Sequence, residues 1–268
     1  MTNVTNISWL SCYKPNPAAT LRLFCFPYAG SSALIYRDWT RSFPEWVEVC
    51  PVQLPGRGIR NREKPFVRMD QLVKALLRDM RPYLSKPFAF FGHSMGAVIG
   101  FELTRLLRRE NAMLPVHLFV SGRGAAQVTT RKPPTYNLPD AAFKQELRRL
   151  KGTPSEVLAH PELMEVVMPL LRADFELIQT YTYTHEQPLN IPLTALGGLE
   201  DEISREEFEG WRAETTGSFS LRMFAGDHFY LTTNQQLLPP ILTEELSMSG
   251  LGSEQPFSVM PKIANSKT

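Results

Sequence analysis

The sequence predicts an α/β fold in which a mostly parallel sheet is flanked by helices. Apolar, strand-like segments at residues 21–26, 88–93 and 117–121 alternate with segments of helical periodicity at 69–80 and 97–107. This alternation is typical of consecutive β–α–β units, whose strands run parallel. A glycine-bearing turn follows each of the three strand segments. Since parallel sheets place their functional sites at the carboxyl ends of the strands, we expect the site near these turns.

The motif with the clearest chemical meaning is Gly92-His93-Ser94-Met95-Gly96, which lies between an apolar run and a helical pattern. Gly-x-Ser-x-Gly between a strand and a helix is the nucleophile elbow of α/β-hydrolases. A serine on so sharp a turn has strained backbone angles, and neighbouring backbone leaves no room for side chains at the two glycines. The adjacent helix N-terminus favours negative charge. We therefore expect an α/β-hydrolase fold with Ser94 as the nucleophile, the alternative being an ordinary serine in a surface turn.

Composition and charge exclude several classes of protein. The chain has 268 residues, of which 43% are hydrophobic and 21% charged, as in a globular protein with one large domain. Its net charge of +2 is too small to indicate binding to nucleic acid or to a membrane surface. No segment approaches the roughly 20 apolar residues of a membrane span, and we expect no signal peptide. The cysteines (Cys12, Cys25 and Cys50) lack metal-ligand spacing, so we expect a reduced, cytoplasmic enzyme without a metal or other cofactor.

Two loops near the amino terminus carry candidate functional groups. The strand at 21–26 precedes residues 27–32, and an α/β-hydrolase places its second oxyanion donor in a loop of this kind. A plain connecting loop is the alternative; we choose the backbone N–H of Ala29 as the donor. A second strand at 47–54 precedes a loop with three arginines, which either bind a phosphate or acidic partner or lie in a solvated turn: Arg57, Arg60 and Arg62.

The alternation breaks over about residues 125–188, where the pattern becomes helical. One helix is expected at 140–151, with Gly152 as its stop, and another at 161–178, which Pro169 should break or kink. A helical insertion between two sheet strands, on the side where the elbow opens, is expected to form a lid. Its apolar side chains either line an acyl pocket or pack among themselves.

The alternation returns after the lid with strands at 191–196 and 219–224. A capping box of Ser204 and Glu207 should open the helix between them, and Gly217 should close it. A last short helix ends near Leu246, with two prolines in its first turn. We expect one domain over residues 1–248 and a disordered tail over residues 249–268.

A nucleophilic serine needs a base, a carboxylate that orients the base, and donors that hold the oxyanion. In α/β-hydrolases these follow in the order Ser, Asp/Glu, His, which Ser94, Asp201 and His228 supply, each just after a predicted strand. Glu200 is the near rival of Asp201, and Asp227 a distant one. We expect the backbone N–H of Met95 to be the first oxyanion donor. The other histidines are expected to be structural or solvent-facing: His93, His117, His160 and His185.

Five spaced blocks resemble the type II thioesterases, the discrete α/β-hydrolases that accompany modular polyketide synthases and nonribosomal peptide synthetases. They span roughly residues 20–245 and are Phe26-Pro-Tyr-Ala-Gly30, Leu54-Pro-Gly-Arg57, Gly92-His-Ser-Met-Gly96, Ala195-Leu-Gly-Gly198 with Asp201, and Ala225-Gly-Asp-His-Phe229. The resemblance implies Ser94, His228 and Asp201 as the catalytic triad, with Ala29 and Met95 as oxyanion donors. The family usually has histidine where Tyr28 stands; because the donor in this loop is a backbone N–H, the difference affects the expectation little.

The resemblance also implies the activity: hydrolysis of incorrect or stalled acyl groups from the phosphopantetheine arm of acyl or peptidyl carrier domains. Carrier domains are commonly acidic, so the arginines of the 57–62 loop and Arg123 are candidates for docking. One alternative is a cytoplasmic carboxylesterase or a medium-chain acyl-releasing thioesterase, and another is a binding module that has lost catalysis. We expect a monomer.

Overall fold

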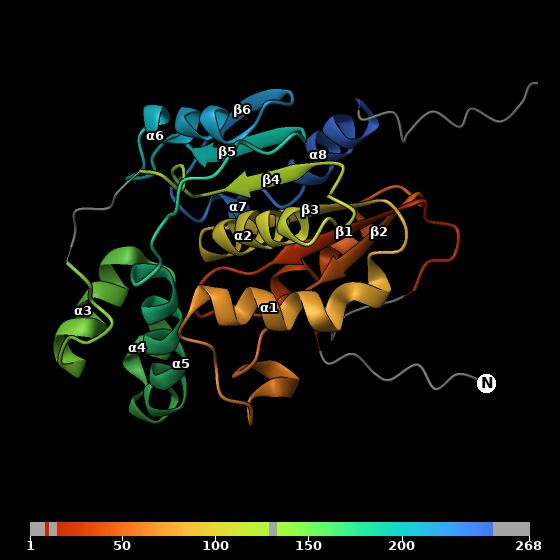
Figure 1. Cartoon of the computed structure of the whole chain (residues 1–268). Helices are drawn as coiled ribbons and strands as arrows, with labels where there is room; N and C mark the ends of the chain where they lie inside the picture. Colours follow the sequence, from red (N-terminus) through yellow and green to blue (C-terminus); the bar gives the residue numbers. More distant parts are fainter. Residues whose placement is uncertain (1–8, 11–14, 129–132, 249–268) are drawn as a thin grey trace, which may run out of the picture.

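The computed structural model describes residues 9–10, 15–128 and 133–248, and its centre is a sheet with the strand order β2-β1-β3-β4-β5-β6 (Figure 1). Every pair of neighbouring strands runs parallel, as the sequence predicts. The expected tail at 249–268 lies outside the described residues. The strands are β1 (Leu21–Phe26), β2 (Val47–Pro51), β3 (Phe88–His93), β4 (Leu118–Ser121), β5 (Leu193–Gly198) and β6 (Phe219–Phe224).

Helices cover both faces of this sheet. Two long helices cover one face, α1 (Met69–Met80) and α2 (Met95–Arg109), and α8 (Leu238–Leu246) lies on the other (Figure 1). The remaining α-helices are α3 (Asp140–Leu150), α4 (Ser155–Ala159), α5 (Pro161–Gln179), α6 (Arg205–Glu209) and α7 (Tyr230–Thr233). Short 3-10 helices occur at Ala33–Tyr36, Asp38–Arg41, Gly58–Arg60, Arg81–Tyr83 and Gly210–Glu214. No helix among the described residues is long and apolar enough to cross a bilayer.

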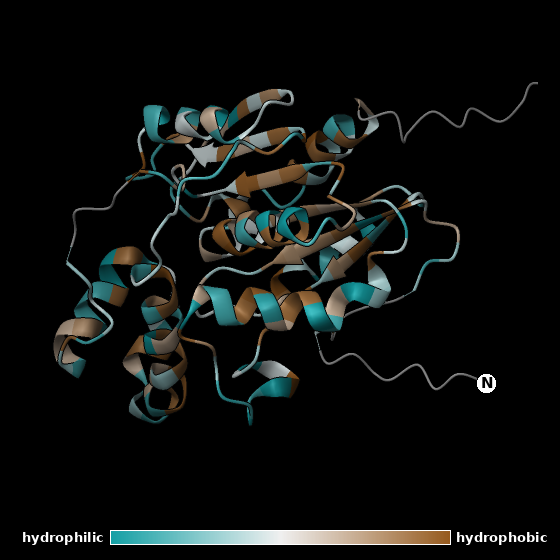
Figure 2. Cartoon of the chain, in the orientation of Figure 1, coloured by the Kyte–Doolittle hydropathy of each residue, from teal (hydrophilic) through white to brown (hydrophobic). Residues whose placement is uncertain are grey.

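The apolar residues of each strand divide between two cores because successive side chains point to opposite faces. In β1, Phe24 and Phe26 pack with α1 and α2, whereas Leu21, Leu23 and Cys25 pack toward α7 and α8. The central strands β3 and β4 are accordingly buried and hydrophobic along most of their length, as is usual when both faces of a parallel sheet are covered (Figure 2). This double burial fixes the strand ends from which the functional loops emerge.

Three described helices, α3, α4 and α5, lie between β4 and β5 in the sequence and form a group at the side toward which these strands point (Figure 1). This group occupies the insertion that is expected to act as a lid, and we call it the lid for that reason. They have a small core of their own, made by Phe143, Leu147, Leu158, Met164 and Leu171. Helix α5 runs through Pro169 without interruption, so the expected break is absent. Its other turns and the packing of its apolar face outweigh the single hydrogen bond that proline cannot make.

The stop of helix α3 differs from the prediction. Lys151, not Gly152, has the left-handed conformation after the last helical turn, with φ of 58°. Gly152 instead allows close packing, because a Cβ there would lie 2.6 Å from Cζ of Phe229. The glycine therefore serves the contact between the lid and the loop after β6, and a lysine bears the strained backbone angle.

Replacing Lys151 with glycine is expected to stabilise the protein by about 0.5–1 kcal/mol, since glycine removes the penalty of the left-handed conformation at some cost in unfolded-chain entropy. Urea unfolding measures this change. The matched control is Asn111→Gly after α2, where φ is 51° but asparagine already tolerates the conformation, so the gain should be smaller. Equal changes at the two positions would contradict the explanation.

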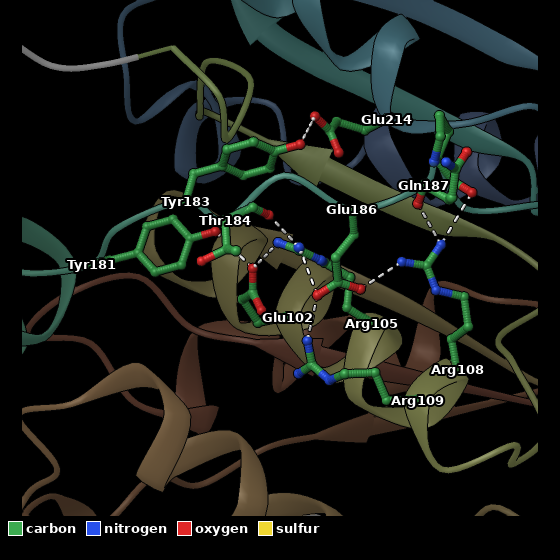
Figure 3. Close-up of polar contacts among 11 residues, drawn as sticks. Glu102, Arg105, Arg108, Arg109, Tyr181, Tyr183, Thr184, Glu186, Gln187 and Glu214 are labelled. Atoms are coloured by element: carbon green, nitrogen blue, oxygen red, sulfur yellow. Dashed lines mark hydrogen bonds and ion pairs between the residues drawn. The ribbon is translucent and has the colours of Figure 1, made fainter.

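The segment that returns from the lid to β5, residues 180–188, is bound tightly to the outer side of α2 (Figure 3). Glu186 receives ion pairs from Arg105 at 2.7 Å, Arg108 at 2.7 Å and Arg109 at 2.6 Å. Arg108 also donates to the carbonyl oxygen of Gln187 at 2.5 Å. One carboxylate thus joins three arginines of a single helix to the connecting segment.

The helix after β5 begins as predicted but ends earlier. Ser204 and Glu207 form the expected capping box at the start of α6. The helix ends at Glu209 and continues as the 3-10 turn Gly210–Glu214, so Gly217 does not close it. A Cβ on Gly217 would lie 2.5 Å from the carbonyl oxygen of Ile191, and this glycine therefore permits a close backbone contact before β6.

Candidate active site

Ser94 lies on the sharp turn between β3 and α2, with φ of 54° and ψ of −110°. This conformation is rare for a residue with a side chain and is retained only where the surroundings enforce it. A Cβ on Gly92 would lie 2.0 Å from the carbonyl oxygen of Gly96, and a Cβ on Gly96 would lie 2.2 Å from that of Phe26. The two glycines therefore permit the turn for the reason expected from the sequence. The Ser94 side chain is presented half-buried at the carboxyl end of β3.

The loop after β1 lies against the start of α2, because Gly96 touches the backbone of Phe26. The carbonyl oxygen of Tyr28 accepts hydrogen bonds from the backbone N–H of Ser31 at 3.1 Å and from its hydroxyl at 2.7 Å. These bonds fix the peptide between Tyr28 and Ala29. Among the described residues, the structure records no acceptor for the Ala29 N–H. Met95 is the first residue of α2, so its N–H has no partner within the helix.

Asp201 and His228 meet across two loops. Oδ2 of Asp201 lies 2.8 Å from Nδ1 of His228. The Asp201 side chain is 2% exposed and that of His228 28%, so the carboxylate is buried beneath an accessible imidazole. The loops approach closely because Gly198 carries no side chain: a Cβ there would lie 2.4 Å from the carbonyl oxygen of Asp227. The contact directs Nε2 of His228 away from the carboxylate, the arrangement in which a histidine can act as a base.

The rival carboxylates lie in other surroundings. Glu200 is exposed to solvent. Asp227 lies 3.7 Å from Nζ of Lys151 and accepts a hydrogen bond from the backbone N–H of Phe229 at 3.0 Å. Of the three candidates, only Asp201 is recorded in contact with an imidazole nitrogen of His228.

The remaining histidines are placed as the sequence suggests. His160 and His185 are exposed. His93 is fully buried, and its Nδ1 lies 2.8 Å from Oγ of Ser121. Burial, and then the proximity of His228, lower the pKa of His93 well below its usual value. His93 is therefore neutral and packs beneath His228, with 5.2 Å between the ring centroids.

His117 predicts a pH dependence of stability. Burial lowers its pKa to about 4, while the unfolded chain titrates near the ordinary value of 6.5. Between these two pH values the unfolded state binds more protons than the folded state, so the free energy of unfolding falls as pH falls from 6.5 toward 4. His117 accounts for about 3 kcal/mol of this fall. His117→Gln, whose amide can keep the 2.8 Å contact with Thr194, should remove that share of the slope in urea unfolding between pH 7 and 4.5. Exposed His185→Gln is the control; parallel stability curves for wild type and His117→Gln would contradict the expectation.

The arginines proposed to dock an acidic partner are not all at the surface. Arg57 and Arg60 are each only 6% exposed, so the docking hypothesis is wrong for these two. Arg60 pairs with Glu63 at 2.5 Å and lies over the ring of Trp9. Arg62 is exposed and Arg123 is half-buried. Two of the three arginines in the loop after β2 are therefore used in buried structural contacts: Arg60 with Glu63 and Gln53 near its own loop, and Arg57 with Asp174 of α5.

Asp174 is a residue near the site that sequence reasoning missed. It lies on α5, is 1% exposed, and pairs with Arg57 through two hydrogen bonds of 2.7 and 2.8 Å. The sequence held one signal: Asp174 lies three residues after Leu171 and three before Leu177, which places a charge on the apolar stripe of the helix. A charge at such a position requires a buried partner, but the pattern does not identify Arg57.

The family is decided by comparison with known proteins. The family model described as a thioesterase domain matches residues 21–246. The chain belongs to the thioesterase family. It is therefore a thioester hydrolase, and its α/β-hydrolase fold agrees with the prediction from the sequence.

Three similar proteins illustrate the family. The thioesterase is 42% identical over 250 residues to the gramicidin S biosynthesis protein GrsT of Aneurinibacillus migulanus, covering 92% of this chain and 98% of the relative. It is 32% identical to the medium-chain S-acyl fatty acid synthase thioesterase of Rattus norvegicus, covering 90% and 94%. The solved structure of BorB, a type II thioesterase from the borrelidin biosynthetic cluster, superposes with a TM-score of 0.79 at 36% identity, covering 87% and 96%. The resemblance to type II thioesterases is thus confirmed.

Proposed function

We propose that this thioesterase removes incorrect or stalled acyl groups from the phosphopantetheine arms of carrier domains in a polyketide or nonribosomal peptide synthase. Two kinds of observation support the proposal. GrsT and BorB are named for the biosynthesis of gramicidin S and borrelidin, and the similar structure YbtT is described as a type II thioesterase from the yersiniabactin NRPS/PKS pathway. The observation that carries the chemistry is the 2.8 Å contact between His228 and Asp201 at the sheet edge that also presents Ser94.

In the proposed first half-reaction, His228 takes the proton of Ser94 while Oγ attacks the thioester carbonyl carbon. The oxygen becomes negatively charged and is stabilised by the backbone N–H groups of Ala29 and Met95. When the intermediate collapses, the carbon–sulfur bond breaks, and the protonated imidazole gives its proton to the departing thiolate. The products are an acyl-serine and a free pantetheine thiol.

In the second half-reaction, water attacks the acyl-serine and His228 takes its proton. A second oxyanion forms and collapses, the bond to Oγ breaks, and the proton returns to the serine. Asp201 holds the imidazole so that Nε2 can accept the proton, and it stabilises the imidazolium that forms in each step. The proposed mechanism uses only these side chains, two backbone donors and water, and it needs no cofactor beyond the partner's phosphopantetheine.

The experiment that tests the function compares hydrolysis of acetyl-, propionyl- and aminoacyl-phosphopantetheinyl carrier protein with that of matching p-nitrophenyl esters. We expect turnover of the short acyl groups on the carrier with kcat/KM well above that of the free esters. Ester cleavage with the carrier substrates left intact would indicate a carboxylesterase instead. A strong preference for medium-chain acyl groups would favour an acyl-releasing role, like that named for the rat relative.

A further inference from the structure

A buried ion pair connects helix α5 of the lid, through Asp174, to Arg57 in the loop that follows β2. Arg57 and Asp174 lie 117 residues apart in sequence, and their side chains are only 5% and 1% exposed. Arg57 donates two parallel hydrogen bonds, from Nη1 to Oδ2 at 2.8 Å and from Nη2 to Oδ1 at 2.7 Å. Planar, two-point pairing of this kind fixes orientation as well as distance.

Both members of the pair also hold the backbone of the neighbouring loop that follows β1. Oδ2 of Asp174 accepts a hydrogen bond from the Gly30 N–H at 2.7 Å. Nη1 of Arg57 donates to the carbonyl oxygen of Ser31 at 3.0 Å. Helix α5 also lies directly against the loop, because a Cβ on Gly30 would lie 2.5 Å from Cδ2 of Leu171. The conformation of residues 28–31 thus depends on a carboxylate that the lid supplies.

These contacts lie one peptide away from a proposed oxyanion donor. The Ala29 N–H belongs to the peptide whose carbonyl, that of Tyr28, is held by the N–H and hydroxyl of Ser31. The next peptide, between Ala29 and Gly30, is held by Asp174. Both peptides flanking Ala29 are therefore restrained, one by Ser31 and the other by the lid.

We propose that Asp174, paired with Arg57, is a positioning residue that sets the direction of the Ala29 N–H, so that the oxyanion hole is complete only when helix α5 is seated. The inference rests on the proposed function, since it takes Ala29 as an oxyanion donor. It adds a residue, and a dependence on the lid, that the triad does not contain.

Stability alone explains this pair poorly. A buried ion pair contributes little net stability, because the cost of removing both charges from water offsets their attraction, and apolar residues of similar volume often serve equally well. The pair's hydrogen bonds to Gly30 and Ser31 offer a different explanation, since apolar side chains cannot orient a peptide. Oxyanion donors stabilise a transition state only when they are held in place before the reaction.

Asp174→Asn tests the proposal, because asparagine keeps the volume but turns an N–H group toward Arg57 or Gly30. We expect kcat for acyl-carrier hydrolysis to fall by about 10- to 100-fold with KM changed less than about threefold. The inhibition constant of an alkyl trifluoromethyl ketone, whose serine adduct carries an oxyanion, should rise by the same factor. Loss of folded enzyme would lower the number of active sites and leave that constant unchanged.

The matched control is Asp140→Asn. It weakens the 2.6 Å ion pair between Asp140 on α3 and Arg172, which lies on α5 as Asp174 does, and it does not affect the loop after β1. It should leave kcat and the inhibition constant within about twofold of wild type. If Asp174→Asn does not fold, the double variant Arg57→Met/Asp174→Leu removes the buried charges and should fold. It should show the same loss of kcat and the same weakening of the ketone.

Unchanged kcat and ketone inhibition in a folded Asp174 variant would overturn the proposal while leaving the thioesterase activity intact. Failure of the proposed function would look different, because wild type itself would then not hydrolyse acyl carriers. The positioning role would in that case be measured with p-nitrophenyl esters and the same ketone. A fall in kcat of the Asp174 variant that matches the rise in its inhibition constant supports the role, and unchanged values of both overturn it.

Discussion

Replacing Ser94 with alanine is expected to lower kcat for acyl-carrier hydrolysis by roughly 10⁵- to 10⁶-fold. Without Oγ no acyl-enzyme forms, and what remains is the attack of water assisted by the oxyanion donors and by binding. Single-turnover assays with a radiolabelled acyl carrier measure residual rates of this size. An alanine variant that keeps more than about one hundredth of the wild-type rate would contradict the role of Ser94 as nucleophile.

The same position also carries a stability prediction. Ser94 has φ of 54° and ψ of −110°, a conformation that is strained for any residue with a Cβ. Ser94→Gly should therefore be as inactive as Ser94→Ala and yet more stable than wild type by about 1 kcal/mol, after allowing for the larger unfolded-state entropy of glycine. Urea unfolding of the two variants gives the comparison. A glycine variant less stable than the alanine variant would show that the strain is not released.

Replacing Asp201 with asparagine is expected to lower kcat by about 10⁴-fold with little change in stability. The carboxylate lies 2.8 Å from Nδ1 of His228, where it accepts a hydrogen bond from the Nδ1–H and so leaves Nε2 unprotonated and able to act as the base. An amide can instead donate to Nδ1, which places the histidine proton on Nε2 and removes the base. It also no longer stabilises the imidazolium. Steady-state kinetics across pH, together with thermal unfolding, separates loss of the base from loss of the fold.

The matched control for this substitution is Asp227→Asn in the loop that carries His228. Asp227 is 40% exposed and lies near Lys151, so its charge contributes little. An amide oxygen can keep the hydrogen bond to the Phe229 N–H. We expect kcat within about threefold of wild type for this control. A larger loss at Asp227 than at Asp201 would reverse the assignment of the orienting carboxylate.

Much of this candidate site can be predicted from short stretches of sequence, because each of its residues is placed by contacts with nearby residues in the chain. The glycines around Ser94 are required by contacts within the turn and with the end of β1, and an apolar strand followed by Gly-Asp-His identifies the position of His228. The sheet follows similarly, because strands buried on both faces give nearly continuous apolar runs. The expected elements and their order therefore needed little knowledge of the tertiary structure.

The parts that sequence could not supply depend on contacts between distant segments. Arg57 is assigned to the surface by composition, and only the fold shows that Asp174 of the lid faces it. Gly152 follows a helix as a stop residue would, yet it is required by the ring of Phe229 from another loop. In both cases the residue type indicated that the position was constrained, but the sequence did not identify the residue that it contacts. Long-range packing overrides local preference at such positions.

The attachment of residues 180–188 to α2 makes the lid mechanically asymmetric. Glu186 holds the connecting segment to three arginines, and Leu177 belongs to the main core, so the last turn of α5 is joined to the body of the protein. Met164 belongs instead to the small core of the lid, and Val166 is 77% exposed. Pro169 lies between the halves, where the helix already lacks one hydrogen bond. Bending should cost least there, so we expect the outer half of the helix to move more readily than the half that bears Asp174.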